Sequence, residues 1–342
     1  MTDLPGLPFA AVDAWLRETL PAVVGDEPWR AEVISGGLSN ITYRLRTAGG
    51  GLVLRRPPLA GALPSAHDMG REFRVLSALR GSAVPVPDAL AFCSRPEVIG
   101  APFYVMREAP GVVLRTADDT AALTVAQRAA IGARLVDTLA ALHGIDPAAV
   151  GLGDFGRPEG YLARQLRRWG EQWERSRTRS LPDMDVLRSR LESRLPAAGR
   201  AAIVHGDFRL DNTLVDLARP EITAVLDWEL STLGDPLADL GVTLVYWHDL
   251  GDDERASVPV AAGLTAQPGF PTAAEFASAY AGRTGADLGD LAYYVAFGSF
   301  KLAIILEGVH ARHLGGRTVG EGYDKVAGAV PVLVARGLRA LA

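Results

Sequence analysis

Residues 203–240, IVHGDFRLDNTLVDLARPEITAVLDWELSTLGDPLADL, carry the pattern that decides the fold of this chain. Apolar segments at 201–204 and 222–226 are typical of short strands, and each runs directly into acidic or amide side chains. Residues 213–215 predict a third short strand between them. We expect a small sheet to bring together the polar residues at the strand ends, which are Asp207, Asn212 and Asp227.

These polar residues have the types and the spacing that phosphoryl transfer requires. Asp207 can accept the proton of a hydroxyl group, and Asn212, five residues later, can reach back across the same loop. Asp227 can join Asn212 on a divalent cation. Such hard oxygen ligands suit Mg²⁺, which takes one or two carboxylates and completes its coordination with water and phosphate oxygens. The pattern H-x-D-x-x-x-x-N followed by a strand-end aspartate therefore predicts kinase-type chemistry.

Length, composition and charge restrict the class of protein. The 342 residues are sufficient for two domains or one two-lobed fold. Hydrophobic residues make up 48% of the chain and charged residues 22%, so long disordered segments are not expected. The net charge of −5 argues against nucleic acid or an acidic membrane as the main partner. These properties favour neither a monomer nor an oligomer.

Cysteine content and the N-terminal sequence bear on the cellular compartment. The single cysteine, Cys93, excludes a disulfide within the chain and is typical of a reducing cytosol. The first residues lack a basic region followed by a long apolar run, so we expect no secretory signal and a cytoplasmic location. The most apolar segment, 293–309, contains Lys301 and Glu307, which favours a buried helix over a membrane span.

Five apolar segments in the first third of the chain predict an antiparallel sheet, at 31–34, 41–46, 52–56, 89–93 and 103–106. Between the first two lies Ser-Gly-Gly-Leu-Ser-Asn, a glycine loop whose backbone N–H groups and hydroxyls can approach phosphate oxygens closely. The candidates for this contact are Gly37, Ser39 and Asn40. A plain tight hairpin has the same composition, so the loop alone does not decide between the two.

The third strand of this sheet is the place where a nucleotide site needs a cation for the phosphates. Arginine must supply it, because the first 300 residues contain no lysine. Arg55 fits the phase of the strand, on the face opposite its two leucines, and Arg56 is the alternative. The helix expected at 68–79 carries Glu72, which is either the partner that orients Arg55 or a solvated helix charge.

The sequence Arg-Glu-Ala-Pro-Gly after the fifth strand predicts a hinge, where the backbone of Arg107 and Ala109 can contact an adenine edge. We therefore expect an N-lobe at 1–106, a hinge at 107–111 and a C-lobe at 112–342. Periodic apolar residues make the C-lobe mostly helical, with helices expected at 125–143, 161–175, 184–195, 236–247, 272–283, 288–312 and 320–341.

Residues 164–179 are rich in arginine, and Arg164, Arg168 and Arg175 fall on one helical face. An anionic acceptor could bind to this face. A solvated surface with salt bridges to nearby glutamates is the preferred interpretation.

Taken together, these motifs resemble the aminoglycoside phosphotransferase and choline kinase-like superfamily, the small-molecule branch of the protein-kinase-like fold. The resemblance lies in HGDFRLDN at 205–212, VLDWE at 225–229 and GDPLADL at 234–240. More narrowly, VLRRPP at 53–58 and LDWELSTLGDP at 226–236 resemble the kinase-like domains fused to some acyl-CoA dehydrogenases. The resemblance implies an α+β, protein-kinase-like two-lobed fold, with a five-stranded antiparallel sheet and a helix in the N-lobe and a mostly helical C-lobe. It also implies ATP or GTP and Mg²⁺ as cofactors.

Carried over position by position, the resemblance implies Asp207 as the catalytic base and Asn212 and Asp227 as Mg²⁺ ligands. Arg209 occupies the place of a protein-kinase lysine that steadies the γ-phosphate, so it is implied to act on the transferred group. Glu229 either orients the waters of the metal or has a structural role.

Other motif residues are expected to support the loop rather than to react. His205, Asp235 and Asp239 are expected to brace it through hydrogen bonds to the backbone. The chain also departs from the family, since arginine replaces the strand lysine, which bears on nucleotide affinity. No histidine lies between Asp207 and Asn212, where drug-modifying members often have one, and this argues against an aminoglycoside substrate.

The resulting prediction is an ATP-dependent O-phosphotransferase that moves the γ-phosphoryl group of Mg-ATP to a hydroxyl of a small molecule. The arginine-rich helix and the resemblance to kinase-like domains fused to acyl-CoA dehydrogenases favour a hydroxyacyl or other anionic acceptor. The alternatives are an aminoglycoside or other antibiotic kinase and a nucleotide-binding scaffold without catalysis. A metal-dependent phosphohydrolase would need more clustered carboxylates or histidines than the six scattered histidines of this chain allow.

Overall fold

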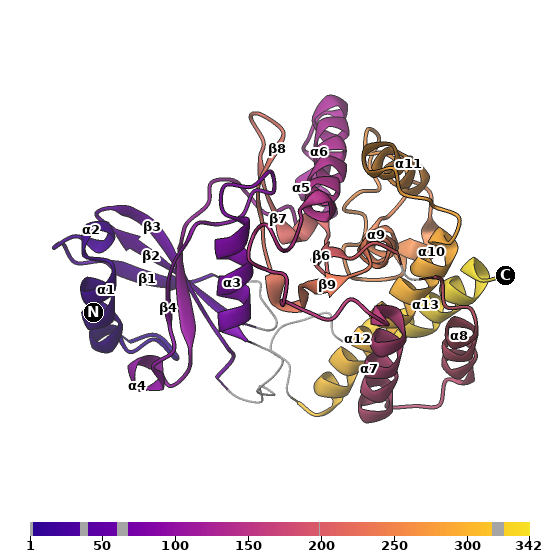
Figure 1. Cartoon of the computed structure of the whole chain (residues 1–342), viewed down its shortest axis with the longest axis horizontal. Helices are drawn as coiled ribbons and strands as arrows, with labels where there is room; N and C mark the ends of the chain where they lie inside the picture. Colours follow the sequence, from indigo (N-terminus) through magenta and orange to yellow (C-terminus); the bar gives the residue numbers. More distant parts are fainter. Residues whose placement is uncertain (1–2, 35–39, 60–67, 198, 317–324) are drawn as a thin grey trace. The chain divides into compact units, whose positions relative to one another are not determined.

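The computed structural model describes residues 3–34, 40–59, 68–197, 199–316 and 325–342 (Figure 1). The chain divides into two compact units, Met1–Gly111 with Thr223–Ser231, and Val112–Ile222 with Thr232–Ala342. The first unit contains a sheet and the second is mostly helical, which confirms the α+β, protein-kinase-like class. The expected hinge at 107–111, with lobes at 1–106 and 112–342, stays a prediction.

The first unit is built on the expected five-stranded antiparallel sheet. Its strands are β1 (Arg30–Val33), β2 (Ile41–Thr47), β3 (Gly50–Arg56), β4 (Ala89–Cys93) and β5 (Phe103–Arg107). Their order across the sheet is β1-β2-β3-β5-β4, and every neighbouring pair is antiparallel. The third strand therefore lies in the centre of the sheet, between β2 and β5, where its side chains are most readily buried.

The leucines of the central strand β3 lie in the core of the first unit. Leu52 and Leu54 of β3 are fully buried and pack with Trp15 of α1 (Phe9–Thr19) and with Trp29. Each leucine contributes about 1.5–3 kcal/mol to folding through its burial. The short helices α2 (Pro21–Val24) and α4 (Pro96–Ile99) also belong to this unit.

Helix α3 (Met69–Leu79) packs against β4 and β5 in the first unit (Figure 1). The carboxylate of Asp68 caps its N-terminus by accepting hydrogen bonds from the backbone N–H groups of Gly70 and Arg71, at 3.0 and 3.1 Å. This cap fixes where the helix begins and therefore which turn carries Glu72.

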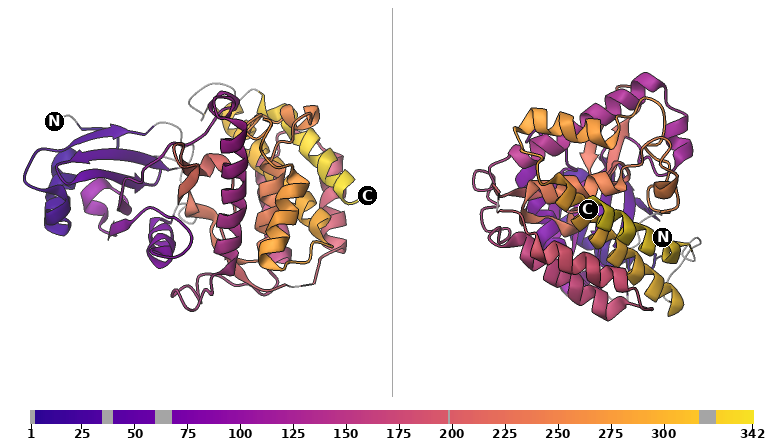
Figure 2. Two further views of the ribbon diagram at one scale, coloured as in Figure 1. Left: turned by 90° about the horizontal axis from the view of Figure 1, so that it is seen from above. Right: turned by 90° about the vertical axis from the view of Figure 1, so that its right-hand side faces the viewer.

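The second unit contains nine α-helices in its described part (Figures 1 and 2): α5 (Ala117–Ala121), α6 (Val125–Gly144), α7 (Tyr161–Ser176), α8 (Pro182–Ser193), α9 (Pro236–Tyr246), α10 (Asp253–Ala256), α11 (Ala273–Thr284), α12 (Leu291–Leu314) and α13 (Val326–Ala340). Helix α12 contacts α7, α8, α9 and α13. Its crossing with α9 is close because Gly241 has no side chain, since a Cβ there would lie 2.4 Å from the carbonyl oxygen of Tyr294. The seven long helices expected from the sequence are present, and residues 320–324 of the last one lie outside the described residues.

The small strands around the central motifs pair differently from our expectation of one sheet. Strand β6 (Ala202–Val204) pairs antiparallel with β9 (Thr232–Gly234), whereas β7 (Thr213–Asp216) pairs with β8 (Glu221–Val225). The prediction was wrong because residues 232–234 are too short and too glycine-rich to be recognised as a strand. They nevertheless occupy the edge of β6, with Ile203 opposite Leu233.

Within the described residues, α12 is the one helix that is long and apolar enough to cross a membrane. Its most apolar window is 78% buried inside the structure, as in the core helix of a folded domain. The interpretation of this segment as a buried helix therefore agrees with the structure.

Candidate active site

The loop after β6 places Asp207 at a sharp turn of the second unit. Gly206 has a φ of 83°, in the left-handed region that glycine adopts without strain. The carboxylate of Asp239 on α9 accepts hydrogen bonds from the backbone N–H groups of His205 (2.6 Å) and Gly206 (2.8 Å). The ring Nδ1 of His205 accepts the N–H of Asp207 at 3.2 Å. Both residues brace the loop through its backbone, as predicted.

Asp235 caps helix α9, whereas we expected it to brace the loop that carries Asp207. Its side chain caps the N-terminus of α9 by accepting the N–H of Leu237 at 2.9 Å, and it accepts the hydroxyl of Tyr294 at 2.6 Å. The start of α9, which carries Asp239 one turn later, is thereby fixed to α12.

The two carboxylate oxygens of Asp207 have different surroundings. Asn212, at the end of the short helix η1 (Leu210–Asn212), donates its Nδ2 to the backbone oxygen of Asp207 (2.9 Å) and to Oδ2 (3.0 Å). Oδ1 is buried and has no hydrogen-bond partner among the described residues. A buried carboxylate oxygen without a partner is unusual in a folded protein. It is available to accept a hydrogen bond from a ligand.

The electrostatic surroundings keep Asp207 ionised. Burial alone raises the pKa of this carboxyl, but the positive charges of Arg209 and Lys301 and the hydroxyl of Tyr246 outweigh burial, so its pKa is lowered. Asp207 is therefore a carboxylate at neutral pH, which is the form that can receive a proton.

Arg209 is held in place on three sides. Its Nε lies 3.2 Å from Oδ2 of Asp207, its Nη1 donates to Oδ2 of Asp211 at 2.7 Å, and its guanidinium stacks 4.8 Å from the ring centroid of Tyr246. Burial raises the pKa of Asp211, an effect that the charge of Arg209 offsets only in part. The role of Arg209 towards a transferred group stays a prediction.

Lys301 belongs to this site, although we did not predict it from the sequence. Its ammonium group, on α12, donates to the carbonyl oxygen of Gly206 and lies 5.5 Å from the ring centroid of Trp169. The available signal was a lysine in the middle of an otherwise apolar helix in a chain with only two lysines. Tyr246 of α9 is also close to Asp207.

In the first unit, Arg55 of β3 bridges two carboxylates. Its Nε lies 2.9 Å from Oε2 of Glu72, and its Nη2 donates to Oδ1 of Asp227. Arg56 instead lies on the buried leucine face, where it donates to the carbonyl oxygens of Gly6 (2.6 Å) and Ile99 (3.1 Å). Of the two alternatives, Arg55 therefore has the geometry of the anchoring cation, and Arg56 ties backbone segments together.

Glu72 is the centre of a buried polar network rather than a solvated helix charge. It is 1% exposed, and it accepts hydrogen bonds from Asn40 (Nδ2 to Oε1, 3.1 Å) and from the hydroxyl of Tyr104 (2.9 Å). Burial raises the pKa of Glu72, and the positive charge of Arg55 opposes this rise. Asn40 also donates to Oε2 of Glu229 at 3.0 Å, so Glu229 takes part in the same network.

Asp227 has a strained backbone. Its φ and ψ of 66° and 62° lie in the left-handed region, which few residues other than glycine adopt. The following turn, η2 (Trp228–Leu230), is fixed by Trp228, whose indole N–H donates to the carbonyl oxygen of Val225 at 3.0 Å. Strain at a partly exposed acidic residue of this kind is typical of functional sites.

The donor set fits a magnesium ion better than a transition metal. Within the described residues, there is no group of three or more His, Cys, Asp or Glu side chains that could hold a metal. Mg²⁺ needs only one or two protein carboxylates or carbonyls. The amide nitrogen of Asn212 donates to Asp207, which leaves the amide oxygen as its coordinating atom. Coordination by Asn212 and Asp227 stays a prediction.

The remaining predicted nucleotide contacts are not tested. The N–H of Arg107 donates to the carbonyl oxygen of Asp88 at 2.9 Å, and Ala109 lies in the coil after β5. Gly37 and Ser39 lie outside the described residues. Contacts of these four positions with a nucleotide, including those of the backbone of Arg107 and Ala109, stay predictions.

The arginine-rich helix α7 has few ion pairs. Arg164 donates to the carbonyl oxygens of Glu159 and Arg157, and Arg168 lies 5.8 Å from the ring centroid of Trp169. The Arg177–Glu174 pair, at 3.1 Å, is one salt bridge of the kind we expected near this face. Arg164 is therefore bonded to neutral carbonyl groups, and Arg168 is exposed.

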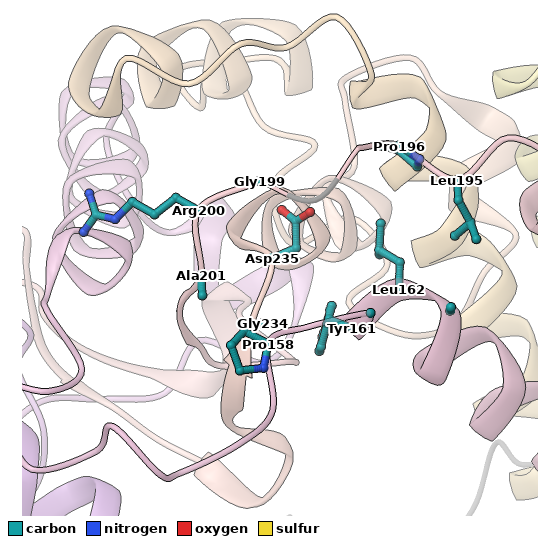
Figure 3. A pocket seen from close by; sticks show the side chains of 12 residues that line it. Pro158, Tyr161, Leu162, Leu195, Pro196, Gly199, Arg200, Ala201, Gly234 and Asp235 are labelled. Atoms are coloured by element: carbon teal, nitrogen blue, oxygen red, sulfur yellow. The ribbon is translucent and has the colours of Figure 1, made fainter.

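A small cavity of about 110 Å³ lies beside the start of α7 (Figure 3). Tyr161 and Leu162 line it from α7, Asp235 from the start of α9, and Pro196 from the chain after α8. Its size suits a few water molecules or one small group. It is too small for a nucleotide or a drug-sized acceptor.

Comparison with known proteins agrees with this geometry. Residues 30–276 match the model of the phosphotransferase enzyme family. The chain is 38% identical over 82% of its length to acyl-CoA dehydrogenase family member 10 of Mus musculus. It spans only 26% of that protein, and 42% of family member 11 of Rattus norvegicus.

Among solved structures, a protein of Ralstonia eutropha that is provisionally assigned as an aminoglycoside phosphotransferase is 36% identical, with a TM-score of 0.81 and 97% of both chains covered. An aminoglycoside phosphotransferase in ternary complex with AMP-PNP and hygromycin B is 19% identical, with a TM-score of 0.62 over 96% of this chain and 98% of the other. The second likeness is one of fold alone.

Proposed function

Because the chain belongs to the phosphotransferase enzyme family, we propose that it transfers the γ-phosphoryl group of Mg-ATP to a hydroxyl group of a small molecule. The observation that carries this proposal is the asymmetry of Asp207. One carboxylate oxygen is held by Asn212 and Arg209, and the other is buried and accepts no hydrogen bond from the part of the chain that the structure describes. An ionised carboxylate in this state is suited to accept the hydrogen bond and then the proton of an acceptor hydroxyl.

Residues of the first unit support nucleotide binding. The guanidinium of Arg55 is positively charged at every relevant pH, and Glu72 and Asp227 hold it in one orientation. In this position it would grip phosphate oxygens with two parallel N–H groups. ATP and GTP are both compatible with this contact, because it does not read the base.

Mg²⁺ held by Asn212 and Asp227 would supply charge neutralisation for the phosphate oxygens. The protein residues position the reacting groups. Asp207 would hold the acceptor hydroxyl in line with the phosphoryl group and receive its proton late in the reaction. Positioning and electrostatics supply most of the acceleration in such reactions.

An anionic acceptor, such as a hydroxyacyl compound, is the class that the second unit favours. The exposed Arg168 has no ion-pair partner among the described residues, and Arg164 on the same helix is bonded to neutral carbonyl groups. The mouse and rat relatives are named as acyl-CoA dehydrogenase family members, which is compatible with an acyl acceptor for the shared segment.

An aminoglycoside, the second candidate, is favoured by the solved structures and disfavoured by the acidic loop at 249–254. A polycationic acceptor needs free carboxylates. Asp252 is paired with Arg336 at 2.8 Å, Glu254 is paired with Arg336 and Arg339, and Asp249 accepts the N–H of Ala273. Two of the four carboxylates of the loop are therefore already paired with arginines.

A panel of hydroxyl compounds with coupled detection of ADP release tests the proposal. The panel contains hydroxy acids, their coenzyme A esters, neutral sugars, amino alcohols and aminoglycosides. We expect ADP release that depends on an anionic hydroxyl compound. Release with aminoglycosides alone would change the acceptor class. If the protein binds nucleotide but releases no ADP with any compound, it is a nucleotide-binding scaffold without catalysis. If ATP is converted to ADP and inorganic phosphate, the protein is a hydrolase.

A further inference from the structure

Lys301 is a buried positive charge next to the loop that carries Asp207. It lies in the middle of α12 and is 7% exposed. Its ammonium group donates to the carbonyl oxygen of Gly206 and faces the ring of Trp169 on α7 at 5.5 Å. Removing an ammonium group from water is costly unless its surroundings replace the lost hydration. A methionine of similar length would fill the same space without this cost.

The positive charge of Lys301 has no directly bonded carboxylate among the hydrogen bonds of the described residues. The acceptor of its hydrogen bond is a neutral carbonyl group, and the negative charges that act on Lys301 are those of Asp207 and Asp239. Burial lowers the pKa of Lys301, and these two carboxylates oppose the change. Such an arrangement is poor evidence for a stabilising role, because buried charges contribute little net stability even when they are paired.

The carbonyl group that Lys301 holds belongs to the peptide that enters Asp207. The oxygen of this peptide accepts from Lys301, and its N–H, which is that of Asp207, donates to His205 at 3.2 Å. The preceding N–H, that of Gly206, is held by Asp239 at 2.8 Å. Both polar atoms of the Gly206–Asp207 peptide are therefore fixed, and the plane of this peptide determines the direction in which the Asp207 side chain leaves the backbone.

Glycine at position 206 makes this control necessary. Gly206 has a φ of 83°, which glycine adopts without strain. Glycine can also adopt many other conformations, so the residue alone does not fix this one. A glycine loop held from one side only would sample several orientations of the next peptide. Here Asp239 accepts a hydrogen bond from the N–H of Gly206, and Lys301 donates one to the carbonyl oxygen of Gly206.

We propose that Lys301 is a positioning residue for phosphoryl transfer, which acts by fixing the Gly206–Asp207 peptide so that the free oxygen of Asp207 points to the acceptor hydroxyl. Its kinetic consequence rests on the proposed function, whereas its effect on the loop does not. No direct contact of Lys301 with a substrate is part of this role.

The test compares Lys301→Met with Glu307→Gln, a second buried charge on the same helix. Glu307 pairs with Thr178 and Arg179 and has no contact with the loop at 205–207 among the interactions recorded for the described residues. The two variants thus remove a buried charge from one helix at two places. Turnover, the KM for ATP and the exchange of backbone amides with deuterium are measured for each.

For Lys301→Met we expect kcat to fall at least tenfold, the KM for ATP to change less than twofold, and amides in residues 203–212 to exchange at least fivefold faster. For Glu307→Gln we expect kcat and the exchange of this segment to stay as in the parent protein. Unchanged kcat in Lys301→Met, or a KM for ATP raised as much as kcat falls, would overturn the positioning role.

The exchange measurement separates this inference from the proposed function. If the parent protein phosphorylates no acceptor, the proposed function fails, and equal exchange of residues 203–212 in both proteins would then still refute the role of Lys301. If Lys301→Met does not fold, Lys301→Leu replaces it, since it also removes both the donor to the carbonyl oxygen of Gly206 and the charge. The same loss of kcat is expected, and parental kcat would contradict the inference.

Discussion

Arg55 and Glu72 form an ion pair inside the first unit, with Nε of Arg55 2.9 Å from Oε2 of Glu72 and side chains 14% and 1% exposed. The same guanidinium reaches Asp227 with Nη2. A lysine ammonium is a single point of charge, whereas the planar guanidinium presents separate N–H groups in fixed directions. Arg55 therefore presents separate N–H groups to two carboxylates at once.

Removing the cation from this pair should destabilise the protein. In Arg55→Met, Glu72 loses its charged partner in a buried site, and we expect the free energy of unfolding to fall by about 3–5 kcal/mol. The double variant Arg55→Met/Glu72→Leu should recover much of this loss. Denaturant unfolding followed by tryptophan fluorescence measures both. As a control, Arg46→Met removes an exposed ion pair with Glu32 and should cost under about 1 kcal/mol. Equal losses in the two single variants would contradict the buried network.

Replacing Asp207 should separate chemistry from binding. Asp207→Asn keeps the size of the side chain and its contact with Asn212 but removes the capacity to take a proton. We expect kcat to fall by about 10²–10⁴-fold, the usual contribution of a general base, with nucleotide affinity within about twofold of the parent. Steady-state kinetics and titration calorimetry measure the two quantities. Normal turnover in this variant would show that another group is the base.

Asp227 should matter for binding of the metal nucleotide. Asp227→Ala removes the carboxylate that we propose as a Mg²⁺ ligand, so the affinity for Mg-ATP should fall at least about 100-fold, as for the loss of other metal-site groups. Affinity for ATP without metal should change far less. Calorimetry with and without Mg²⁺ distinguishes the two. Asp216→Ala, in a surface pair with Arg219, is the matched control. Unaltered Mg-ATP affinity in Asp227→Ala would exclude this ligand.

The first unit and the main motifs could be predicted because their signals are local. Alternation along β3 placed Arg55 opposite the leucines, and the spacing from Asp207 to Asn212 placed an amide within reach of a carboxylate. The choice between Arg55 and Arg56 followed from the same phase, since burial of one face of a strand leaves the other face for a ligand.

The contributions of distant helices could not be predicted, because no local pattern encodes which buried residue meets which loop. Lys301 is 95 positions from Gly206 in sequence, and its helix packs there through tertiary contacts alone. The pairing of β9 with β6 was missed for a related reason. A three-residue strand has too few positions to show alternation, and its partner is fixed by the fold around it.

Asp239 should make stability depend on pH in the acid range. Burial raises the pKa of this carboxyl, but the hydrogen bond and charge of His143 and the N–H of His205 outweigh burial, so its pKa lies below the ordinary 3.8. The unfolded chain therefore takes up the proton first, and the stabilisation is full above pH 3.8 and lost as the pH falls through the folded value. The difference in unfolding free energy between the parent and Asp239→Asn should be full at about pH 5 and shrink below about pH 4. A difference that is independent of pH down to acid unfolding would contradict the lowered pKa.

An anionic acceptor should depend on the basic face of α7. Arg168→Ala is expected to raise the KM for the acceptor about tenfold, the effect of one charge-assisted hydrogen bond, with the KM for ATP unchanged. Arg190→Ala, on α8, removes an exposed arginine elsewhere and should leave both constants unaffected. If the two variants behave alike, α7 is only a solvated surface.

The fate of the γ-phosphoryl group is the most direct test of the central claim, that this protein phosphorylates a hydroxyl group of a small anionic molecule. The purified protein is incubated with Mg-ATP and each acceptor that supports ADP release, and the products are followed by ³¹P nuclear magnetic resonance. The account predicts a phosphate monoester on the acceptor that appears in equal amount to ADP. Phosphate that appears only as inorganic phosphate, or ATP that stays intact with every acceptor, would contradict it.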